Sequence, residues 1–268
     1  ATGKAYVLDA AGGATEDDSV MPEAGVLRVS GLPWGTYRFV ETVPAGGFAG
    51  QVGNDPVTSD AFVVARDTVE AEAVRQDVEN RPTQLVLRKT NEDGSAALPD
   101  VRFTVTPTGA STFADGTTGA KELTTGADGT ASLEGQLCVG ATYDIAETAA
   151  PAGYELAGES LRVTVQADGS LAAADGVSAP WSLDGSAATV SLADEPIRAF
   201  VKKVNANDET QALSGVTFDV VGAFADGAAS KSVETGADGT VLIEGLVAGN
   251  RYQVTETGVP AGYTRIAG

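Results

Sequence analysis

The sequence predicts an all-β protein built from tandem β-sandwich domains, and three observations lead to this prediction. The 268 residues include 33 glycines, and no long apolar stripe has the period of a helix. Short runs rich in valine and threonine alternate with turn signals at regular spacing. A segment centred on a Glu-Thr pair occurs three times, with Glu41, Glu147 and Glu256 lying 106 and 109 residues apart. That spacing is the usual size of one domain.

The elements of one repeat can be read in order along the chain. An apolar strand at 85–91 matches 200–205, and a second strand at 100–105 matches 215–220 and 3–8. An Asp-Gly pair at 128–129 and at 238–239 supplies the positive φ that a tight hairpin turn needs. The glutamate strand follows, and a closing strand then runs into a short linker marked by Pro82 or Pro196. We therefore predict domains at 1–82, lacking its first strand, at 83–197, complete, and at 198–268, lacking its last strands.

Composition excludes several classes of function. Seventeen Lys and Arg against 37 Asp and Glu give a net charge of −20, which would repel nucleic acid and anionic membranes. With Cys138 as the single cysteine and no histidine, an intramolecular disulfide, an imidazole-based triad and a zinc site are excluded. No run of about 18 apolar residues is present, so we expect no membrane insertion in this segment. No signal peptide is visible, and we expect no cofactor and no metal.

Three strands of each repeat carry a polar residue on their apolar face. Side chains alternate between the two faces of a strand, so Tyr143, Ile145 and Glu147 share one face, which should be the core. The same parity joins Leu85 and Leu87 to Lys89, and Val190 and Leu192 to Asp194. In the outer repeats the corresponding inward polar residues are Glu41, Asn80, Lys203 and Glu256.

These inward residues allow three interpretations. Each one alone could reach solvent at a strand end, or a lysine and an aspartate could form a buried ion pair, which desolvation makes costly. The third interpretation is a reaction. Burial favours the neutral forms of amines and carboxyls, a neutral amine is a nucleophile, and a protonated glutamate can pass protons. The amine would attack Cγ of Asp or Asn, release water or ammonia, and leave an amide cross-link.

The Lys-x-Asn strand at Lys89, the Glu-Thr-x-x-Pro-Ala-Gly-Tyr segment at Glu147 and the closing Asp194-x-Pro resemble the Cna protein B-type domains. These SpaA-like, or prealbumin-like, domains with an immunoglobulin-like sandwich occur in adhesins and pilins on the surface of Gram-positive bacteria. The resemblance covers nearly the whole chain and implies an intramolecular isopeptide bond. It implies that Lys89 is the cross-linking lysine, Asp194 its acceptor and Glu147 the catalytic acid.

In the outer repeats the same resemblance implies that Asn80 is an acceptor, Lys203 a cross-linking lysine, and Glu41 and Glu256 the catalytic acids. The partners of Asn80 and Lys203 would lie outside this chain. Lys202 is a neighbouring alternative to Lys203, but the parity of Val201 favours Lys203. The first repeat departs from the motif, because it is one residue shorter between Glu41 and Pro44 and has Gly47 where the others have tyrosine.

The leading functional hypothesis is a structural segment, a stalk or pilus shaft, of a cell-wall-attached extracellular protein. Its partners would be neighbouring pilus or surface subunits. The alternative is an adhesin module that binds host protein or glycan through its loops, for which Trp34 and Trp181 are the candidate aromatics. An enzyme acting on external substrates is the third and weakest hypothesis. Two acidic stretches, 16–18 and 205–208, lack the full ligand spacing of a calcium loop.

Overall fold

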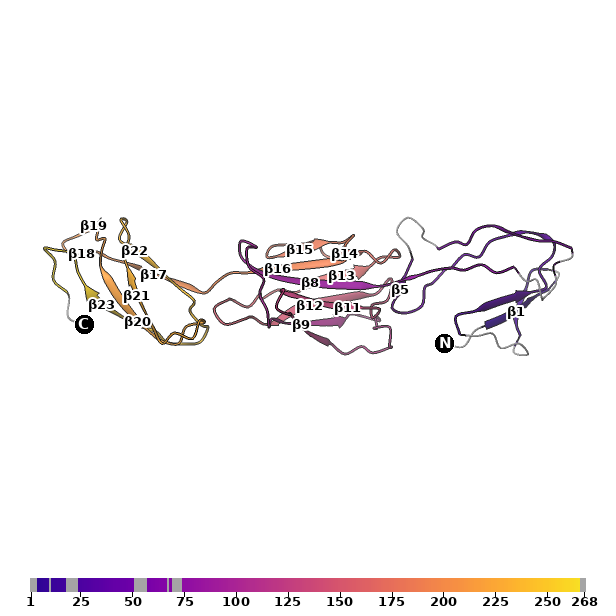
Figure 1. The fold of residues 1–268 in the computed structure, drawn as a ribbon, viewed down its shortest axis with the longest axis horizontal. Helices are drawn as coiled ribbons and strands as arrows, with labels where there is room; N and C mark the ends of the chain where they lie inside the picture. Colours follow the sequence, from indigo (N-terminus) through magenta and orange to yellow (C-terminus); the bar gives the residue numbers. More distant parts are fainter. Residues whose placement is uncertain are drawn as a thin grey trace. The chain divides into compact units, whose positions relative to one another are not determined.

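The computed structural model describes residues 4–9, 11–17, 24–50, 57–66, 68 and 74–265, and these form strands, turns and loops with no helix among them (Figure 1). The all-β prediction is confirmed. The chain divides into two compact units. Unit 1 comprises Ala1–Pro44 and Gly50–Arg81, and unit 2 comprises Ala45–Ala49 and Pro82–Gly268. The second and third predicted domains both fall within unit 2, and their boundaries stay a prediction.

Unit 1 contains short strands around a small core. Strands β1 (Lys4–Leu8), β2 (Ala14–Glu16) and β3 (Leu27–Ser30) form a sheet in the order β2-β1-β3. Strand β4 (Gly35–Tyr37) pairs antiparallel with β6 (Phe62–Val64). Phe39 stacks on Phe62 with a ring separation of 5.3 Å, which is the principal aromatic contact of this unit. The two-residue strand β5 (Phe48–Ala49) belongs to unit 2, and β7 (Arg81–Pro82) covers the last residue of unit 1 and the first residue of the second segment of unit 2.

The largest part of unit 2 is a two-sheet sandwich, which we call the central sandwich. Its five-stranded sheet has the order β10-β9-β12-β13-β14, and its four-stranded sheet has the order β11-β8-β16-β15. The strands are β8 (Gln84–Asn91), β9 (Arg102–Pro107), β10 (Lys121–Thr124), β11 (Thr130–Glu134), β12 (Thr142–Ala149), β13 (Leu161–Val165), β14 (Leu171–Ala173), β15 (Trp181–Asp184) and β16 (Thr189–Asp194).

Alternation of apolar and polar residues along these strands produces the sandwich. Every second residue is buried in β12 from Tyr143 to Glu147, in β16 from Val190 to Asp194, and in β8 from Leu85 to Lys89. The apolar faces of the two sheets share one hydrophobic core that includes Leu87, Phe103 and Ile145. The predicted parity of these three strands is therefore confirmed. Strand β16 lies beside β8 and runs parallel to it, so the closing strand of the repeat pairs with the opening strand (Figure 1).

The remaining strands of unit 2 form a second repeat, which we call the C-terminal repeat. They are β17 (Arg198–Lys202), β18 (Val204–Asn205), β19 (Asp208–Ala212), β20 (Thr217–Val221), β21 (Ser230–Glu234), β22 (Thr240–Glu244) and β23 (Gln253–Gly258). Strand β17 pairs with β22, β18 with β19, and β20 lies between β21 and β23. Two small core clusters, centred on Val220 and on Val216, replace the single large core of the central sandwich.

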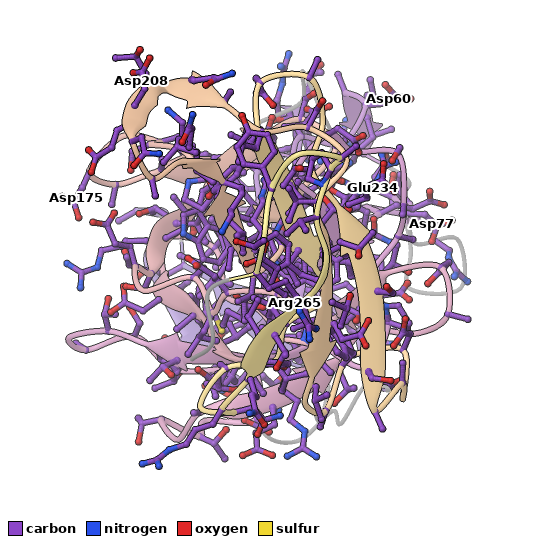
Figure 2. The ribbon with its side chains drawn as sticks, turned by 90° about the vertical axis from the view of Figure 1, so that its left-hand side faces the viewer. Asp60, Asp77, Asp175, Asp208, Glu234 and Arg265 are labelled. Carbon is purple, nitrogen blue, oxygen red and sulfur yellow. The ribbon has the colours of Figure 1, made fainter. Side chains whose placement is uncertain are left out.

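The excess of negative charge lies on the surface. The acidic side chains labelled in Figure 2, among them Asp60, Asp175 and Asp208, are exposed and point away from the ribbon. Such a surface favours solubility, because molecules of like charge repel one another. None of the described segments contains a helix long and apolar enough to cross a membrane.

Candidate functional site

Two main-chain hydrogen bonds fix the backbone of Lys89 in the central sandwich. Its N–H donates to the carbonyl of Gly129 at 2.8 Å, and its carbonyl accepts the N–H of Leu98 at 3.0 Å. Gly129 belongs to the predicted Asp-Gly turn and has a φ of +71°; a Cβ there would lie 2.5 Å from the Lys89 carbonyl oxygen. Only glycine combines this backbone conformation with so close an approach. The turn therefore fixes the strand residue that carries the amine.

The two sheets bring three ionisable side chains together. Lys89 and Asp194 lie on adjacent parallel strands, β8 and β16, with Leu192 opposite Lys89 in the register. Glu147 lies on β12 of the facing sheet. Because all three point into the core, the lysine and the aspartate meet within one layer and the glutamate approaches them from the other.

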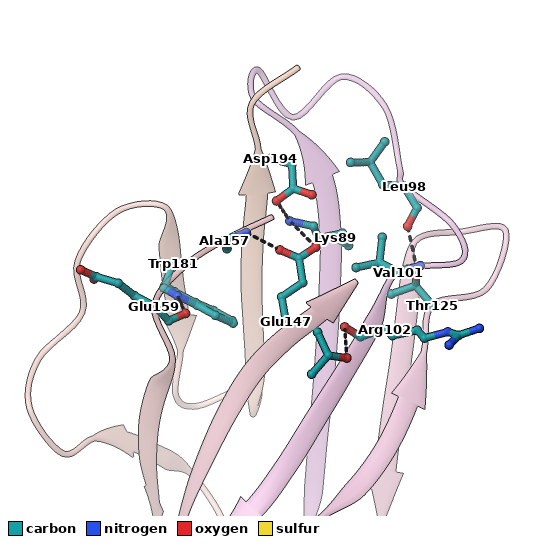
Figure 3. Close-up of polar contacts among 11 residues, drawn as sticks. Lys89, Leu98, Val101, Arg102, Thr125, Glu147, Ala157, Glu159, Trp181 and Asp194 are labelled. Carbon is teal, nitrogen blue, oxygen red and sulfur yellow. Dashed lines mark hydrogen bonds and ion pairs between the residues drawn. The ribbon is translucent and has the colours of Figure 1, made fainter. Parts of the chain in front are cut away.

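The resulting contacts are direct (Figure 3). The Nζ of Lys89 forms a hydrogen bond and ion pair with Oδ1 of Asp194 and lies 3.6 Å from Oε1 of Glu147. The exposed fractions of the three side chains are 0% for Lys89, 0% for Glu147 and 1% for Asp194. The other carboxylate oxygen of Glu147 accepts the N–H of Ala157 at 2.9 Å. Water is thus excluded from a cluster of one amine and two carboxyl groups.

Two oxygens of this cluster are buried without a hydrogen-bond partner among the described residues, Oε1 of Glu147 and Oδ2 of Asp194. Leaving such an atom unpaired costs about 1–3 kcal/mol. The buried charges and unpaired oxygens of the cluster therefore destabilise the folded state. A reaction that removes the charges and releases one of the oxygens as water would stabilise the protein.

Burial also changes the protonation of the carboxyl groups. Desolvation raises the pKa of Glu147 from 4.5 to about 7, against the opposing effects of the Ala157 N–H and the positive charge of Lys89. Desolvation likewise raises the pKa of Asp194 above its ordinary value, although the contact with Lys89 acts in the other direction. A carboxyl group whose pKa lies near neutrality can both donate and accept a proton under physiological conditions.

In unit 1 the structure brings together the predicted acceptor and acid. The Nδ2 of Asn80 donates to Oε1 of Glu41 at 2.8 Å, and both residues are half-buried. The Oδ1 of Asn80 is buried and has no hydrogen-bond partner in the described part of the chain. Asn80 and Glu41 thus contact each other directly, whereas Asp194 and Glu147 of the central sandwich both contact Lys89.

In the C-terminal repeat the predicted lysine and acid also meet. The Nζ of Lys203 contacts Oε2 of Glu256 at 3.0 Å, while Lys202 is exposed. The side chain that turns toward the glutamate is thus that of Lys203, and its role as a cross-linking lysine stays a prediction. The side chains are more accessible than in the central sandwich, 22% for Lys203 and 13% for Glu256. The backbone setting is the same, because the N–H of Lys203 donates to the Gly239 carbonyl at 2.8 Å.

Sequence reasoning missed two contributors to the site. The N–H of Ala157, which orients Glu147, comes from an irregular segment whose sequence carries no signal. The Asp-Gly pattern predicts only a turn at Gly129 and Gly239, although the repetition of these glycines before the same strand is a signal for a position close to the lysine. The first repeat also needs a different alignment. The N–H of Phe48 bonds to Ala45 as Tyr154 bonds to Pro151, so Phe48, not Gly47, occupies the aromatic position.

The remaining candidate residues divide clearly. Trp181 is buried at 5% exposure and belongs to the core, whereas Trp34 is 69% exposed, with the guanidinium of Arg66 5.1 Å from its ring centre. In the two acidic stretches, Asp18 lies outside the described residues, and Asp208 caps its own turn through Thr210. No group of three or more His, Cys, Asp or Glu in the described ranges is placed to hold a metal ion.

Comparison with known families agrees with this architecture. A family model described as SpaA, a prealbumin-like fold domain, matches residues 83–177 and 198–267, which together are more than half of the chain. The chain belongs to this family. The SpaA-type matches begin at Thr83 and at Arg198, next to the opening strands β8 and β17. No curated protein matches the chain.

Several solved structures resemble the chain at low sequence identity. The Bacillus anthracis TIE protein is 16% identical with a TM-score of 0.36; the match covers 85% of this chain and 46% of that one. A Streptococcal ancillary pilin is 19% identical with a TM-score of 0.35, and the match covers 88% of this chain and 70% of that one. A C-terminal fragment of the pilus adhesin SpaC from Lactobacillus rhamnosus GG is 20% identical with a TM-score of 0.36, and the match covers 68% of this chain and 78% of that one. The chain thus spans less than half the length of the TIE protein.

Proposed function

We propose that this chain is a structural segment, a stalk or pilus shaft, of an extracellular protein attached to the cell wall of a Gram-positive bacterium. Its central sandwich would be closed by an isopeptide bond between Lys89 and Asp194. The observation that carries the proposal is the contact of the Lys89 Nζ with Asp194 and its 3.6 Å approach to Glu147, in a site that excludes water. Membership of the prealbumin-like family supports the surface location.

The reaction follows from the protonation that burial favours. Proton transfer within the Lys89–Asp194 pair gives an amine and a carboxylic acid, and the amine lone pair attacks Cγ of Asp194. Glu147 accepts a proton from the attacking nitrogen and returns one to the departing hydroxyl group. A C–N bond forms, a C–O bond breaks, one water leaves, and Glu147 ends as it began. Because these groups are already in contact, the reaction needs no diffusional encounter. Well-oriented intramolecular reactions of this kind reach effective molarities of about 10⁵ M or more.

The bond would stabilise the fold because it acts on the unfolded state. Lys89 and Asp194 are 105 residues apart in sequence, and closing a loop of that length lowers the entropy of the unfolded chain by an amount equivalent to about 4–5 kcal/mol, by analogy with disulfides. An amide, unlike a disulfide, also resists reductants. The catalysis is performed once, on the chain itself, so the protein is not an enzyme toward external substrates.

Intact mass spectrometry tests the proposal. The wild-type chain should be lighter than its sequence by one water, and tandem spectra of its peptides should show Lys89 joined to Asp194. Glu147→Ala should restore the full mass. The matched control is Glu155→Ala, because Glu155 is an exposed glutamate on the same segment, and this variant should keep the deficit.

A second variant makes the test specific. An Asp-Gly pair can lose water by forming a succinimide, and this chain contains several such pairs. Lys89→Met abolishes the cross-link and leaves those pairs intact, so the deficit should disappear in this variant. A wild-type chain of unmodified mass, or a deficit that survives Lys89→Met, would contradict the proposal.

The outer repeats extend the same proposal. In the same reaction, Asn80 with Glu41 would be an acceptor–acid pair, and Lys203 with Glu256 a lysine–acid pair. We further propose the boundaries 1–82, 83–197 and 198–268 for the three domains. Limited proteolysis should then cut near Pro82 and Ile197 before it cuts within the central sandwich.

A second candidate function is supported by one observation. Trp34 exposes 69% of its surface beside Arg66, and an exposed aromatic ring with a cation next to it is a common element of recognition surfaces. In an adhesin module this site would bind host protein or glycan. Glycan arrays and host-protein panels with wild type and Trp34→Ala test it; binding that Trp34→Ala abolishes would favour the adhesin.

A further inference from the structure

Three glycines at equivalent positions differ in their surroundings. Gly47, Gly153 and Gly262 each follow the repeat's glutamate by six residues. All three have positive φ, at +85°, +94° and +90°. Gly47 and Gly153 are buried, whereas Gly262 is exposed, and a Cβ on it would have no described atom within 4 Å. The same turn is thus covered in two repeats and open in the third.

The main chain that follows the closing strand covers the first two turns. The carbonyl of Gly47 accepts the N–H of Thr83 at 2.9 Å, and the carbonyl of Gly153 accepts the N–H of Ile197 at 2.8 Å. Thr83 and Ile197 lie three residues after Asn80 and Asp194 respectively. The two hydrogen bonds therefore join equivalent atoms at the start of successive repeats, which shows that the contact is a repeated feature.

The bare α-carbon of each buried glycine faces the same pair of loops. A Cβ on Gly47 would lie 2.2 Å from the carbonyl oxygen of Gly135 and 3.2 Å from Cβ of Ala114. A Cβ on Gly153 would lie 2.8 Å from Cβ of Ala225 and 3.9 Å from Cα of Gly245. Ala114 and Ala225 occupy the same place in two Phe-Ala-Asp-Gly loops, and Gly135 and Gly245 the same place in two Glu-Gly turns.

The Phe-Ala-Asp-Gly loops are preorganised for this contact. In each, the phenylalanine is buried and a lysine Nζ lies 4.7 Å from its ring centre, Lys121 over Phe113 and Lys231 over Phe224. The same lysine pairs with the loop aspartate at 3.0 Å in both repeats. The alanine N–H is fixed as well, donating to Gln136 or to Gly245. A loop that is ordered before docking loses little entropy on docking.

We propose that the Pro-Ala-Gly turn after each glutamate strand is a docking site for the next prealbumin-like repeat. The partner that fits it has an alanine-tipped Phe-Ala-Asp-Gly loop beside a Glu-Gly turn, and it places the N–H of the first residue after its linker on the glycine carbonyl. The small residues are required on both sides because the backbones approach within side-chain distance. The inference concerns the joint between repeats and does not depend on the cross-link.

Amide hydrogen exchange by NMR on the full chain tests the joint. Ala225→Leu enlarges the loop tip at a residue of ordinary φ, so it should lower the protection of the Ile197 amide by about tenfold or more as the joint opens. The core amide of Val220 in the C-terminal repeat should keep its protection. Ala229→Leu, on the same stretch but outside the contact, is the matched control, and Ala225→Ser should behave as wild type.

The equivalent contact at Gly47 provides an independent test if Ala225→Leu disturbs the core of the C-terminal repeat. There, Ala114→Leu should lower the protection of the Thr83 amide and leave that of Val105 unchanged. In the wild-type chain, Tyr263, which follows the uncovered Gly262, should exchange faster than Tyr154. Unchanged protection of Ile197 in Ala225→Leu with Val220 intact, or of Thr83 in Ala114→Leu with Val105 intact, would overturn the proposal.

Discussion

The central sandwich and the C-terminal repeat place a lysine and a glutamate in the same way, yet they differ in access to water. Lys89 and Glu147 are fully buried, whereas Lys203 and Glu256 expose 22% and 13% of their side chains. The backbone bond that fixes the lysine is 2.8 Å in both. The difference comes from β16, which pairs with β8, while β17 pairs with β22 alone in the described part of the chain.

This difference indicates which part of the fold would make the proposed reaction possible. The residue types and their parity place the lysine and the glutamate, but the closing strand carries Asp194, the proposed acceptor, and excludes water from the site. Ile145, beside Glu147, is fully buried, whereas its counterpart Val254 is 44% exposed. Without the extra strand a lysine–glutamate pair remains an ordinary, partly hydrated ion pair. Four experiments test this comparison between the two regions.

The largest effect should come from removing the acceptor. Asp194→Ala abolishes the cross-link and leaves Lys89 buried without its partner, so the free energy of unfolding of the central sandwich should fall by about 4 kcal/mol or more. Urea unfolding followed by Trp181 fluorescence in a Trp34→Phe background measures it. In the C-terminal repeat, Glu256→Ala removes the one carboxylate that contacts Lys203 in the described part of the chain, and it should cost about 1 kcal/mol or less.

Asp194→Asn is the control for that experiment, since it keeps an acceptor. It should retain most of the stability and lose one ammonia in place of one water. Equal losses from Asp194→Ala and Glu256→Ala would mean that burial does not distinguish the two sites.

The next effect is a dependence on pH that only the buried site should have. In Lys89→Met, which cannot cross-link, Glu147 keeps a folded-state pKa of at least about 7 against 4.5 in the unfolded chain, because the lysine charge that lowers it is gone. The folded state then binds the extra proton, so stability should fall as pH rises from 4.5 to 7, by on the order of 3 kcal/mol.

Urea unfolding at several pH values follows this dependence. In Lys89→Met with Glu147→Gln the dependence should shrink to the part due to Asp194, whose pKa is also raised. A slope in Lys89→Met that is unchanged by Glu147→Gln would rule out Glu147 as its origin.

A smaller effect should be equal in the two regions. Gly129→Ala and Gly239→Ala each place a Cβ within 2.6 Å of a lysine carbonyl oxygen at positive φ, which should cost about 1–3 kcal/mol in either repeat. Gly94→Ala has a similar φ of +73° and open space around it, so it isolates the backbone cost from the clash. If Gly129→Ala lowers the free energy of unfolding no more than Gly94→Ala does, the close approach to the lysine carbonyl is tolerated.

The smallest effect should again be shared. The hydroxyl of Tyr143 bonds to Thr112 and Cys138, and that of Tyr252 bonds to Ala223 and Val247. Tyr143→Phe and Tyr252→Phe should each cost about 1 kcal/mol, measured by core amide exchange at Val105 and Val220. A clear inequality would indicate that the two scaffolds differ in more than the closing strand.

The sequence predicted those features that depend on alternation along one strand. The inward direction of Lys89, Glu147 and Asp194 followed from period-two patterning alone. The choice of Lys203 over Lys202 followed from that patterning together with the alignment to Lys89. The meeting of the three groups required the pairing of strands far apart in sequence, for which the recurring parity was an indirect indication. The contact with Ala157, from an irregular segment, had no pattern that could reveal it.

The repeat alignment shows the same limit. Counting from the proline placed Gly47 opposite a tyrosine, because one residue is missing before Pro44 and one is added after it. The structure aligns the positive-φ glycines, all six residues after their glutamates. The backbone conformation at these glycines therefore determines how the repeats align. The sequence indicates that conformation only through the presence of glycine. The uneven burial of the two lysine–glutamate pairs was equally invisible, since their local sequences are nearly the same.

The parallel pairing of β8 with β16 has a mechanical consequence. Lys89 lies near the end of the opening strand and Asp194 at the end of the closing one. If the proposed amide joins these two residues, a force that enters at Gln84 and leaves at Pro196 would travel along β8 to Lys89, cross the amide and exit beyond Asp194. Residues 90–193 would then lie outside the path of tension. The sandwich would transmit a pull without stretching its own core.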